Sequence, residues 1–229
     1  GLTYRQQEKF DKSIADYSKA IELDRNLAMA YAGRGETFRK KKSFKKALAD
    51  FTRAIEMKPR YKWAIGHRGM TYRQIEDFDG AIADFSRAIV IDPAYDWVWA
   101  ERGKTYRQKG VFDKAVADLD KAVELDPDYK WAYGQRGIAY REKGAFDRAI
   151  DDFGKALTID PAYDWAYAER GKTYREKGDL DKAIADFSRA IAINPADDWG
   201  YAERGQTYRE KGDLDKAIAI DPSYDWAYA

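Results

Sequence analysis

The chain has 229 residues, and its 41 lysines and arginines nearly balance its 40 aspartates and glutamates, which leaves a formal net charge of +1. This balance argues against a general polyanion-binding protein, so any basic feature has to be local. The absence of cysteine excludes disulfides, thiolate catalysis and cysteine metal sites, and the single histidine, His67, cannot form a histidine cluster.

A 34-residue period runs through the whole chain. One glycine recurs at every step of the period: Gly1, Gly35, Gly69, Gly103, Gly137, Gly171 and Gly205. Five prolines keep the same spacing: Pro59, Pro93, Pro127, Pro161 and Pro195. Fixed-period self-similarity of this kind predicts stacked structural repeats that bury their apolar faces against one another. The fold class that follows is an all-α solenoid of 34-residue helix-turn-helix repeats.

The repeats follow one another along the chain. Residues 1–27 are the end of a first repeat, and complete repeats occupy residues 28–61, 62–95, 96–129, 130–163 and 164–197. Residues 198–224 form a shortened repeat, and residues 225–229 open a further one. Because the chain begins inside a repeat and without Met, we expect it to be part of a longer protein.

Each repeat contains two predicted helices, and we number its positions so that the periodic glycine is position 8. The first helix is predicted over positions 2–14. It ends near a turn where a residue without a Cβ is favoured, and later repeats have Gly110, Gly144, Gly178 and Gly212 there. Earlier repeats have Glu8, Lys42 and Glu76, so their turns should be costlier. The second helix follows, with Asp at position 18 near its start in most repeats, and the proline at position 32 stops it.

The shortened repeat lacks seven residues, because the fourteen residues 182–195 align with only seven at 216–222. Either its second helix is truly short, since seven residues are about two helical turns and keep the apolar face, or the sequence joins across a missing loop. A Cα–Cα distance well beyond about 3.8 Å near Ala219 would reveal the missing loop. In both interpretations the C-terminal end lacks a polar capping helix, so we expect self-association through uncapped terminal repeats.

These recurring residues resemble the tetratricopeptide repeat family, and the resemblance covers the whole chain. Position 4 is large and mostly aromatic: Tyr31, Ile65, Trp99, Tyr133, Tyr167 and Tyr201. Position 11 is aromatic, positions 20 and 27 are small, and position 24 is aromatic except at Leu119. The resemblance implies a right-handed superhelix whose concave groove is lined by positions 2, 5, 9, 12 and 13, where ligands sit. The chain departs from the family at position 7, where it has Arg in place of the usual Leu.

The predicted groove carries two rows of large side chains. Position 2 forms the tryptophan row: Trp63, Trp97, Trp131, Trp165 and Trp199. Position 12 forms the arginine row: Arg39, Arg73, Arg107, Arg141 and Arg175. Position 5 is Ala or Gly and is predicted to form the groove floor. Because Trp and Arg often dominate binding energy, we expect both rows to meet a ligand.

Structural alternatives for both rows stay open. The tryptophans could pack between adjacent first helices against the preceding Tyr and leave only an edge in the groove. The arginines could pair with glutamates at position 13 of a neighbouring repeat: Glu142, Glu176 and Glu210.

The arginine at position 7 is predicted to point inward, where a partly buried guanidinium needs a partner. In two antiparallel helices that turn near position 15, position 7 lies across from position 23, which is Asp. The sequence therefore predicts a ladder of structural ion pairs: Arg34–Asp50, Arg68–Asp84, Arg102–Asp118, Arg136–Asp152 and Arg170–Asp186. Arg204 has lost its aspartate in the shortened repeat.

No unique carboxylate pair, Ser/His constellation, phosphate loop or metal-ligand cluster interrupts the period, so we predict no enzyme activity, catalytic residue, metal or cofactor. The favoured function is a protein–protein interaction or scaffold module that binds a peptide segment of a partner, an acidic one where the arginines take part. One alternative is a sensor or regulatory region of a larger bacterial signalling protein. Another is single-stranded nucleic-acid binding, which the near-zero net charge argues against. No apolar run approaches a membrane span, so no membrane partner is expected and a cytoplasmic location is favoured.

Overall fold

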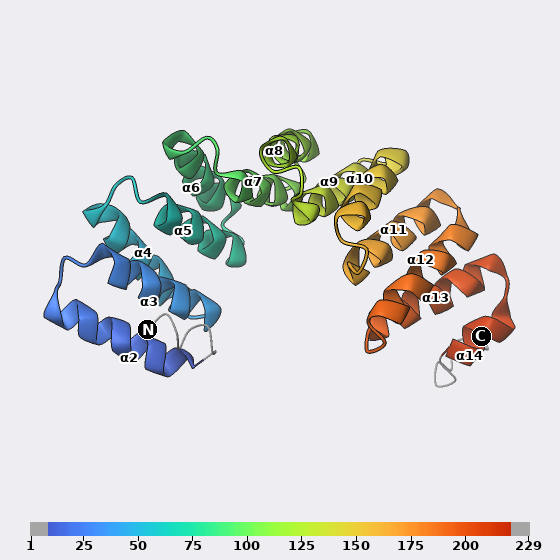
Figure 1. Ribbon diagram of the computed structural model, residues 1–229, viewed down its shortest axis with the longest axis horizontal. Coiled ribbons are helices and arrows are strands. Elements are labelled where there is room, and N and C mark those ends of the chain that lie inside the picture. Colours follow the sequence, from blue (N-terminus) through green and yellow to red (C-terminus); the bar gives the residue numbers. More distant parts are fainter. Residues whose placement is uncertain (1–8, 221–229) are drawn as a thin grey trace. The chain divides into compact units, whose positions relative to one another are not determined.

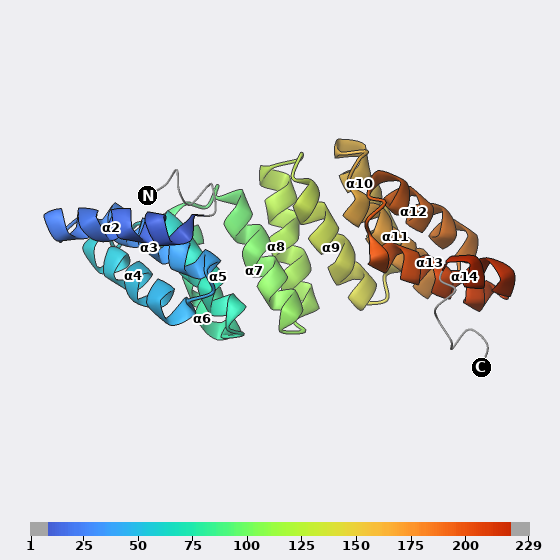
Figure 2. The ribbon, with the colours of Figure 1, turned by 90° about the horizontal axis from the view of Figure 1, so that it is seen from below.

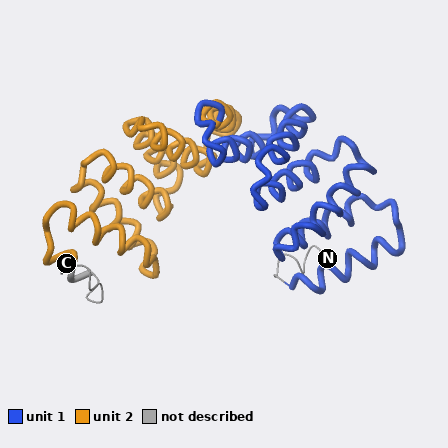
Figure 3. The backbone as a smooth tube through the Cα atoms, turned by 180° about the vertical axis from the view of Figure 1, so that it is seen from behind, with its two compact units in different colours: residues 1–114 blue, residues 115–229 orange. Residues whose placement is uncertain are grey.

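The computed structural model describes residues 9–220, and this part of the chain contains thirteen helices and no strand. The chain divides into two compact units, residues 1–114 and 115–229 (Figure 3). Within each unit, antiparallel helix pairs lie side by side in a stack (Figure 1 and Figure 2). Each unit is therefore built as the stacked helix-turn-helix repeats that the period predicts.

The first unit begins with the second helix of the partial repeat, α2 (Phe10–Leu23). The pairs α3 (Ala28–Lys40) with α4 (Phe44–Met57) and α5 (Lys62–Gln74) with α6 (Phe78–Ile91) follow. The first helix of the next repeat, α7 (Asp96–Gln108), is the last helix that lies wholly in this unit.

The second unit contains most of α8 (Phe112–Leu125), which starts just before the boundary between the units. The pairs α9 (Lys130–Glu142) with α10 (Phe146–Ile159) and α11 (Asp164–Lys177) with α12 (Leu180–Ile193) follow. The last pair is α13 (Asp198–Lys211) with α14 (Leu214–Ile220). Helix α14 has 7 residues, half the 14 of α12. The predicted opening of a further repeat at residues 225–229 lies outside the described residues.

The helix ends follow local chemistry. First helices begin at position 1, one residue earlier than predicted, and Asp96, Asp164 and Asp198 place a carboxylate in the first turn, where the helix dipole favours it. The glycines of the later turns have φ between +74° and +93°. Lys42 and Glu76 occupy the same turns with φ of 58° and 62°. Because a Cβ disfavours this left-handed conformation, these two turns are strained, as the sequence predicts.

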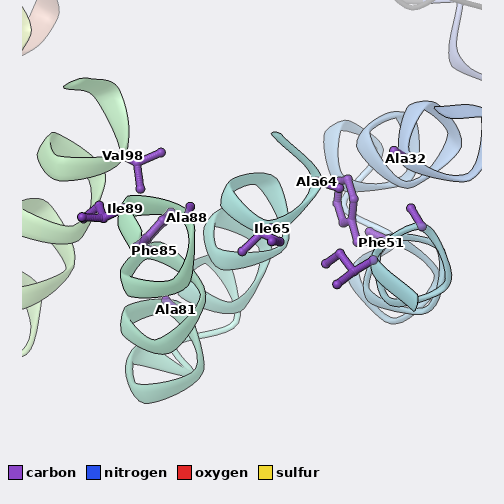
Figure 4. Packing of buried hydrophobic residues seen from close by; sticks show 12 residues of the cluster. Ala32, Phe51, Ala64, Ile65, Ala81, Phe85, Ala88, Ile89 and Val98 are labelled. Atoms are coloured by element: carbon purple, nitrogen blue, oxygen red, sulfur yellow. The ribbon is translucent and has the colours of Figure 1, made fainter. Parts of the chain in front are cut away.

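The core of each repeat depends on the glycine at position 8. A Cβ on Gly69 would lie 2.9 Å from the ring of Phe85, and one on Gly171 would lie 3.0 Å from the ring of Phe187. The phenylalanines at position 24 are fully buried, and in the first unit they pack with alanines and Ile65 (Figure 4). The absence of a side chain at position 8 therefore lets the two helices of a repeat approach closely, with the aromatic ring filling the contact.

Candidate functional site

The first helices of consecutive repeats share one surface, which we call the first-helix face. It is defined by positions 2, 6, 9, 12 and 13 on α3, α5 and α7 in the first unit and on α9, α11 and α13 in the second. Within each unit these helices touch their successors directly: α3 contacts α5, α5 contacts α7, α9 contacts α11, and α11 contacts α13. Side chains from neighbouring repeats therefore meet on this face.

The tryptophan row lies on this face, but most of it is partly covered. Trp63, Trp97, Trp131 and Trp165 are half-buried, whereas Trp199 is 40% exposed. Each of the first four packs against the tyrosine two residues before it, with ring centroids 5.1–6.1 Å apart. Much of each indole is thus used in packing, and the remaining ring surface is what a ligand could reach.

The residues at position 5 do not line an open groove, so that prediction is wrong. In the repeats from residue 28 to residue 197 they are buried. A Cβ on Gly66 would lie 2.7 Å from the ring of Trp97, and one on Gly134 would lie 2.4 Å from the ring of Trp165. The indole of the following repeat packs directly against each of these two glycines, because a side chain larger than hydrogen would clash with the ring.

His67 lies in a network that spans two repeats. Its Nδ1 is 3.1 Å from Glu36 Oε2, and its ring lies 4.0 Å from the Trp63 ring and 5.5 Å from the Trp97 ring. Arg39 donates to both oxygens of the same carboxylate, at 2.7 and 2.8 Å. Burial alone would raise the pKa of Glu36, but hydrogen bonds from His67 and Arg39 outweigh it and lower that pKa to about 2. Glu36 therefore stays ionised at neutral pH and joins α3 to α5.

Three more arginines of the row pair with glutamates that the sequence analysis did not predict. Three arginines contact the position-6 glutamate of the next repeat: Arg73 with Glu101, Arg141 with Glu169 at 2.6 Å, and Arg175 with Glu203 at 2.7 Å. The side chains of Arg39, Arg73, Arg141 and Arg175 are only 8–12% exposed. Arg107 is half-buried near the end of α7. Most arginines of the row therefore already form ion pairs with glutamates of the same chain.

The expected glutamates at position 13 are further away. Glu176 lies 3.7 Å from Arg141, and Glu210 lies 3.9 Å from Arg175. Both glutamates are more than a third exposed, so each adds a weaker, wetter contact to an arginine that already has a partner.

The structure brings together four of the predicted ion pairs. The guanidinium forks of Arg34, Arg68, Arg136 and Arg170 each donate two hydrogen bonds of 2.6–2.8 Å to Asp50, Asp84, Asp152 and Asp186, respectively. All four carboxylates are buried. Arg102 and Asp118 fall in different units, so their pair stays a prediction. Paired two-point contacts of this kind orient the first helix against the second within a repeat.

The position-7 arginines also contact the second helix of the preceding repeat, a contact that the sequence analysis did not predict. Four of them donate to a hydroxyl at position 25 of the preceding repeat: Arg34 to Ser18, Arg68 to Thr52, Arg102 to Ser86 and Arg204 to Ser188, at 2.9–3.0 Å. Arg136 donates to Asp120 at 2.7 Å in the same way. Arg204 has Ile220 where the other repeats have Asp, and its buried Nε has no hydrogen-bond partner.

Residues 9–220 contain neither a metal-binding cluster nor a membrane-spanning helix. No group of three or more His, Asp or Glu side chains in this part of the chain could hold a metal ion. None of the helices described there is long and apolar enough to cross a membrane.

Comparison with known proteins agrees with this architecture. A family model described as TPR repeat matches residues 1–42, 69–110, 103–144, 137–176 and 171–212, and one described as Tetratricopeptide repeat matches residues 28–61. No curated protein sequence matches the chain.

Solved structures share the fold at low sequence identity. The structure of PilW, a type IV pilus biogenesis factor, has a TM-score of 0.80 at 18% identity, covering 89% of this chain and 95% of that one. YrrB, described as a TPR protein with an unusual peptide-binding site, has a TM-score of 0.63 at 24% identity, covering 86% and 97%. The APC/C hetero-tetramer Cut9-Hcn1 has a TM-score of 0.77 at 16% identity, covering 99% of this chain but only 46% of that one. The all-α solenoid fold predicted from the period is thereby confirmed.

Proposed function

Because the chain belongs to the tetratricopeptide repeat family, we propose that it is a non-enzymatic interaction module that holds a segment of a partner protein on its first-helix face. The observation that carries this proposal is the row of tryptophans, one in each repeat from residue 62 onward, on the face that consecutive first helices share. A row of this kind offers a partner a series of apolar contacts separated by polar groups, which suits an extended or helical peptide.

The most accessible apolar side chains of the face are Met29 and Trp199. Met29, at the tryptophan position of its repeat, is 62% exposed, and Trp199 is 40% exposed. A large apolar side chain that a ligand can cover contributes more to binding than one already packed in the chain. YrrB, whose description includes a peptide-binding site, supports a peptide as the ligand class.

Selection from a display library of random peptides tests this function. The chain should select peptides with recurring apolar residues, and the double variant Met29→Ala with Trp199→Ala should weaken the selected peptides about tenfold or more. Val90→Ala is the matched control, because Val90 is 81% exposed but lies on the second helix α6, away from this face.

Circular dichroism should show that both variants keep their helical content. Selected peptides that bind the double variant as tightly as the unsubstituted chain would contradict the proposal. Equal losses for the double variant and for Val90→Ala would contradict it as well.

A further inference from the structure

We infer that the part of the first-helix face on α5 and α7 receives an acidic segment of a partner protein, whereas the equivalent part on α9 and α11 does not. This inference rests on the proposed function and specifies the chemistry of the ligand at one place on the face. It follows from a difference in charge between two otherwise equivalent parts of the chain.

Six positions on two consecutive first helices define each part. On α5 and α7 they are Arg73, Gln74, Glu101, Lys104, Arg107 and Gln108. On α9 and α11 they are Arg141, Glu142, Glu169, Lys172, Arg175 and Glu176. The first set has three cations and one carboxylate, and the second has three cations and three carboxylates. The two sets differ only in the exchange of two glutamines for two glutamates, which removes a surplus of two positive charges.

Contacts within the first set place its charges together. Arg73 pairs with Glu101 through Nη2, and its Nη1 lies 3.4 Å from the Gln108 amide oxygen. Lys104 follows Glu101 by three residues on α7, so the two side chains lie on one side of the helix. The buried Nε of Arg73 has no hydrogen-bond partner. The charges of Arg73, Glu101 and Lys104 therefore lie close together where α5 meets α7.

The surplus of positive charge in the first set also lowers the pKa values of its own cations. Burial lowers the pKa of Lys104, and the positive charges of Arg73 and Arg107 lower it further, against the opposing effect of Glu101. Burial likewise lowers the pKa of Arg73, with Arg39 and Arg107 adding to it. Partly buried cations that repel one another are stabilised by an incoming anion.

The second set places more carboxylates around its arginines, although the buried Nη1 of Arg175 has no hydrogen-bond partner. Arg141 contacts Glu169 at 2.6 Å and has Glu176 at 3.7 Å, so one guanidinium stands between two carboxylates. An additional carboxylate from a partner would meet two glutamates there and be repelled. The same peptide therefore meets attraction on α5 and α7 and repulsion on α9 and α11.

A protein carboxylate fits this place better than a nucleic acid. Single-stranded nucleic acids bind by stacking bases on open aromatic faces. The neighbouring indole of Trp97 is instead half-buried, covers Gly66, and has the rings of Tyr95 and His67 within 5.5 Å. A carboxylate can bind through ionic contacts with the cations alone and requires no open aromatic ring on which to stack.

Two labelled peptides test the inference by fluorescence anisotropy: one alternating leucine with glutamate, and one of the same length alternating leucine with glutamine. The unsubstituted chain should bind the glutamate peptide about tenfold more tightly at low salt, with the preference shrinking as salt is added. The double variant Gln74→Glu with Gln108→Glu should lose the preference. The reciprocal variant Glu142→Gln with Glu176→Gln should increase it.

Each remaining outcome has a definite meaning. A preference that survives Gln74→Glu with Gln108→Glu, or that is absent in the unsubstituted chain while the glutamine peptide binds, would overturn the inference and leave the proposed function standing. Failure of both peptides to bind would overturn the two together. A single-stranded oligonucleotide that binds more tightly than the glutamate peptide, and is lost in the same variant, would assign the cations to nucleic acid instead.

Discussion

Replacement of Asp84 by Asn tests whether the position-7 ion pairs hold the repeats together. Asp84 accepts two hydrogen bonds from Arg68, at 2.7 and 2.8 Å, and the two side chains are only 7% and 15% exposed. Removal of one partner from a buried pair costs about 3–5 kcal/mol, because the other charge is left without compensation. Arg68 would keep its bond to Thr52, so we expect the lower end, about 3 kcal/mol.

The assay is urea unfolding followed by far-ultraviolet circular dichroism. The double variant Arg68→Met with Asp84→Leu should recover most of the lost stability, because a buried pair replaced by apolar residues is often neutral. Arg204→Met is an internal control, since Arg204 has no aspartate partner and should cost much less. A loss below about 1 kcal/mol for Asp84→Asn, typical of a surface pair, would refute this reasoning, as would an equal loss for Arg204→Met.

Three further predictions concern single residues. Lys42→Gly should raise the free energy of unfolding by about 1 kcal/mol, because Lys42 has φ of 58°, and a thermal melt measures it. The pKa of Glu36, about 2 against 4.5, gives it a stabilising contribution of about 3 kcal/mol that is present above pH 4.5 and lost as the pH falls toward 2. The stability difference from Glu36→Gln, measured in urea at each pH, should shrink over that window; a constant difference would contradict it. Gly134→Ala should destabilise the chain by about 1–3 kcal/mol and change tryptophan fluorescence, because its Cβ would lie 2.4 Å from the Trp165 ring. Gly154→Ala, whose nearest neighbour is 3.9 Å away, should not destabilise it.

The fold and the contacts within a repeat were predictable from the sequence. Two antiparallel helices joined by a short turn have a register fixed by that turn, so position 7 could be matched with position 23 by counting. The same counting placed the turn glycines and identified Lys42 and Glu76 as strained. The first helices start one residue earlier than predicted whether their first residue is acidic, as Asp96 is in α7, or basic, as Lys62 is in α5.

Contacts between repeats were not predictable in the same way. The register of one repeat on the next depends on side-chain packing at the interface, which a single period does not reveal. Counting therefore did not show that Arg141 would reach Glu169, or that Arg68 would reach Thr52. The glycines at position 5 were misassigned for the same reason, since the Trp97 ring that fills the space over Gly66 belongs to the following repeat.

We expect unfolding of the second unit to begin at the repeat junction that contains Gly154. At the other repeat junctions within a unit, the position-7 arginine also donates a hydrogen bond to a side-chain oxygen at position 25 of the preceding repeat. Arg170 has Gly154 at that place, which has no side chain to accept a hydrogen bond. In a linear array, cooperativity depends on the strength of each junction between neighbours. The α10–α11 junction should therefore be the weakest link of the second unit, and partial unfolding should separate α11–α14 from α9–α10 there. A serine at residue 154 would supply the missing hydroxyl and make the flanking repeats melt as one block.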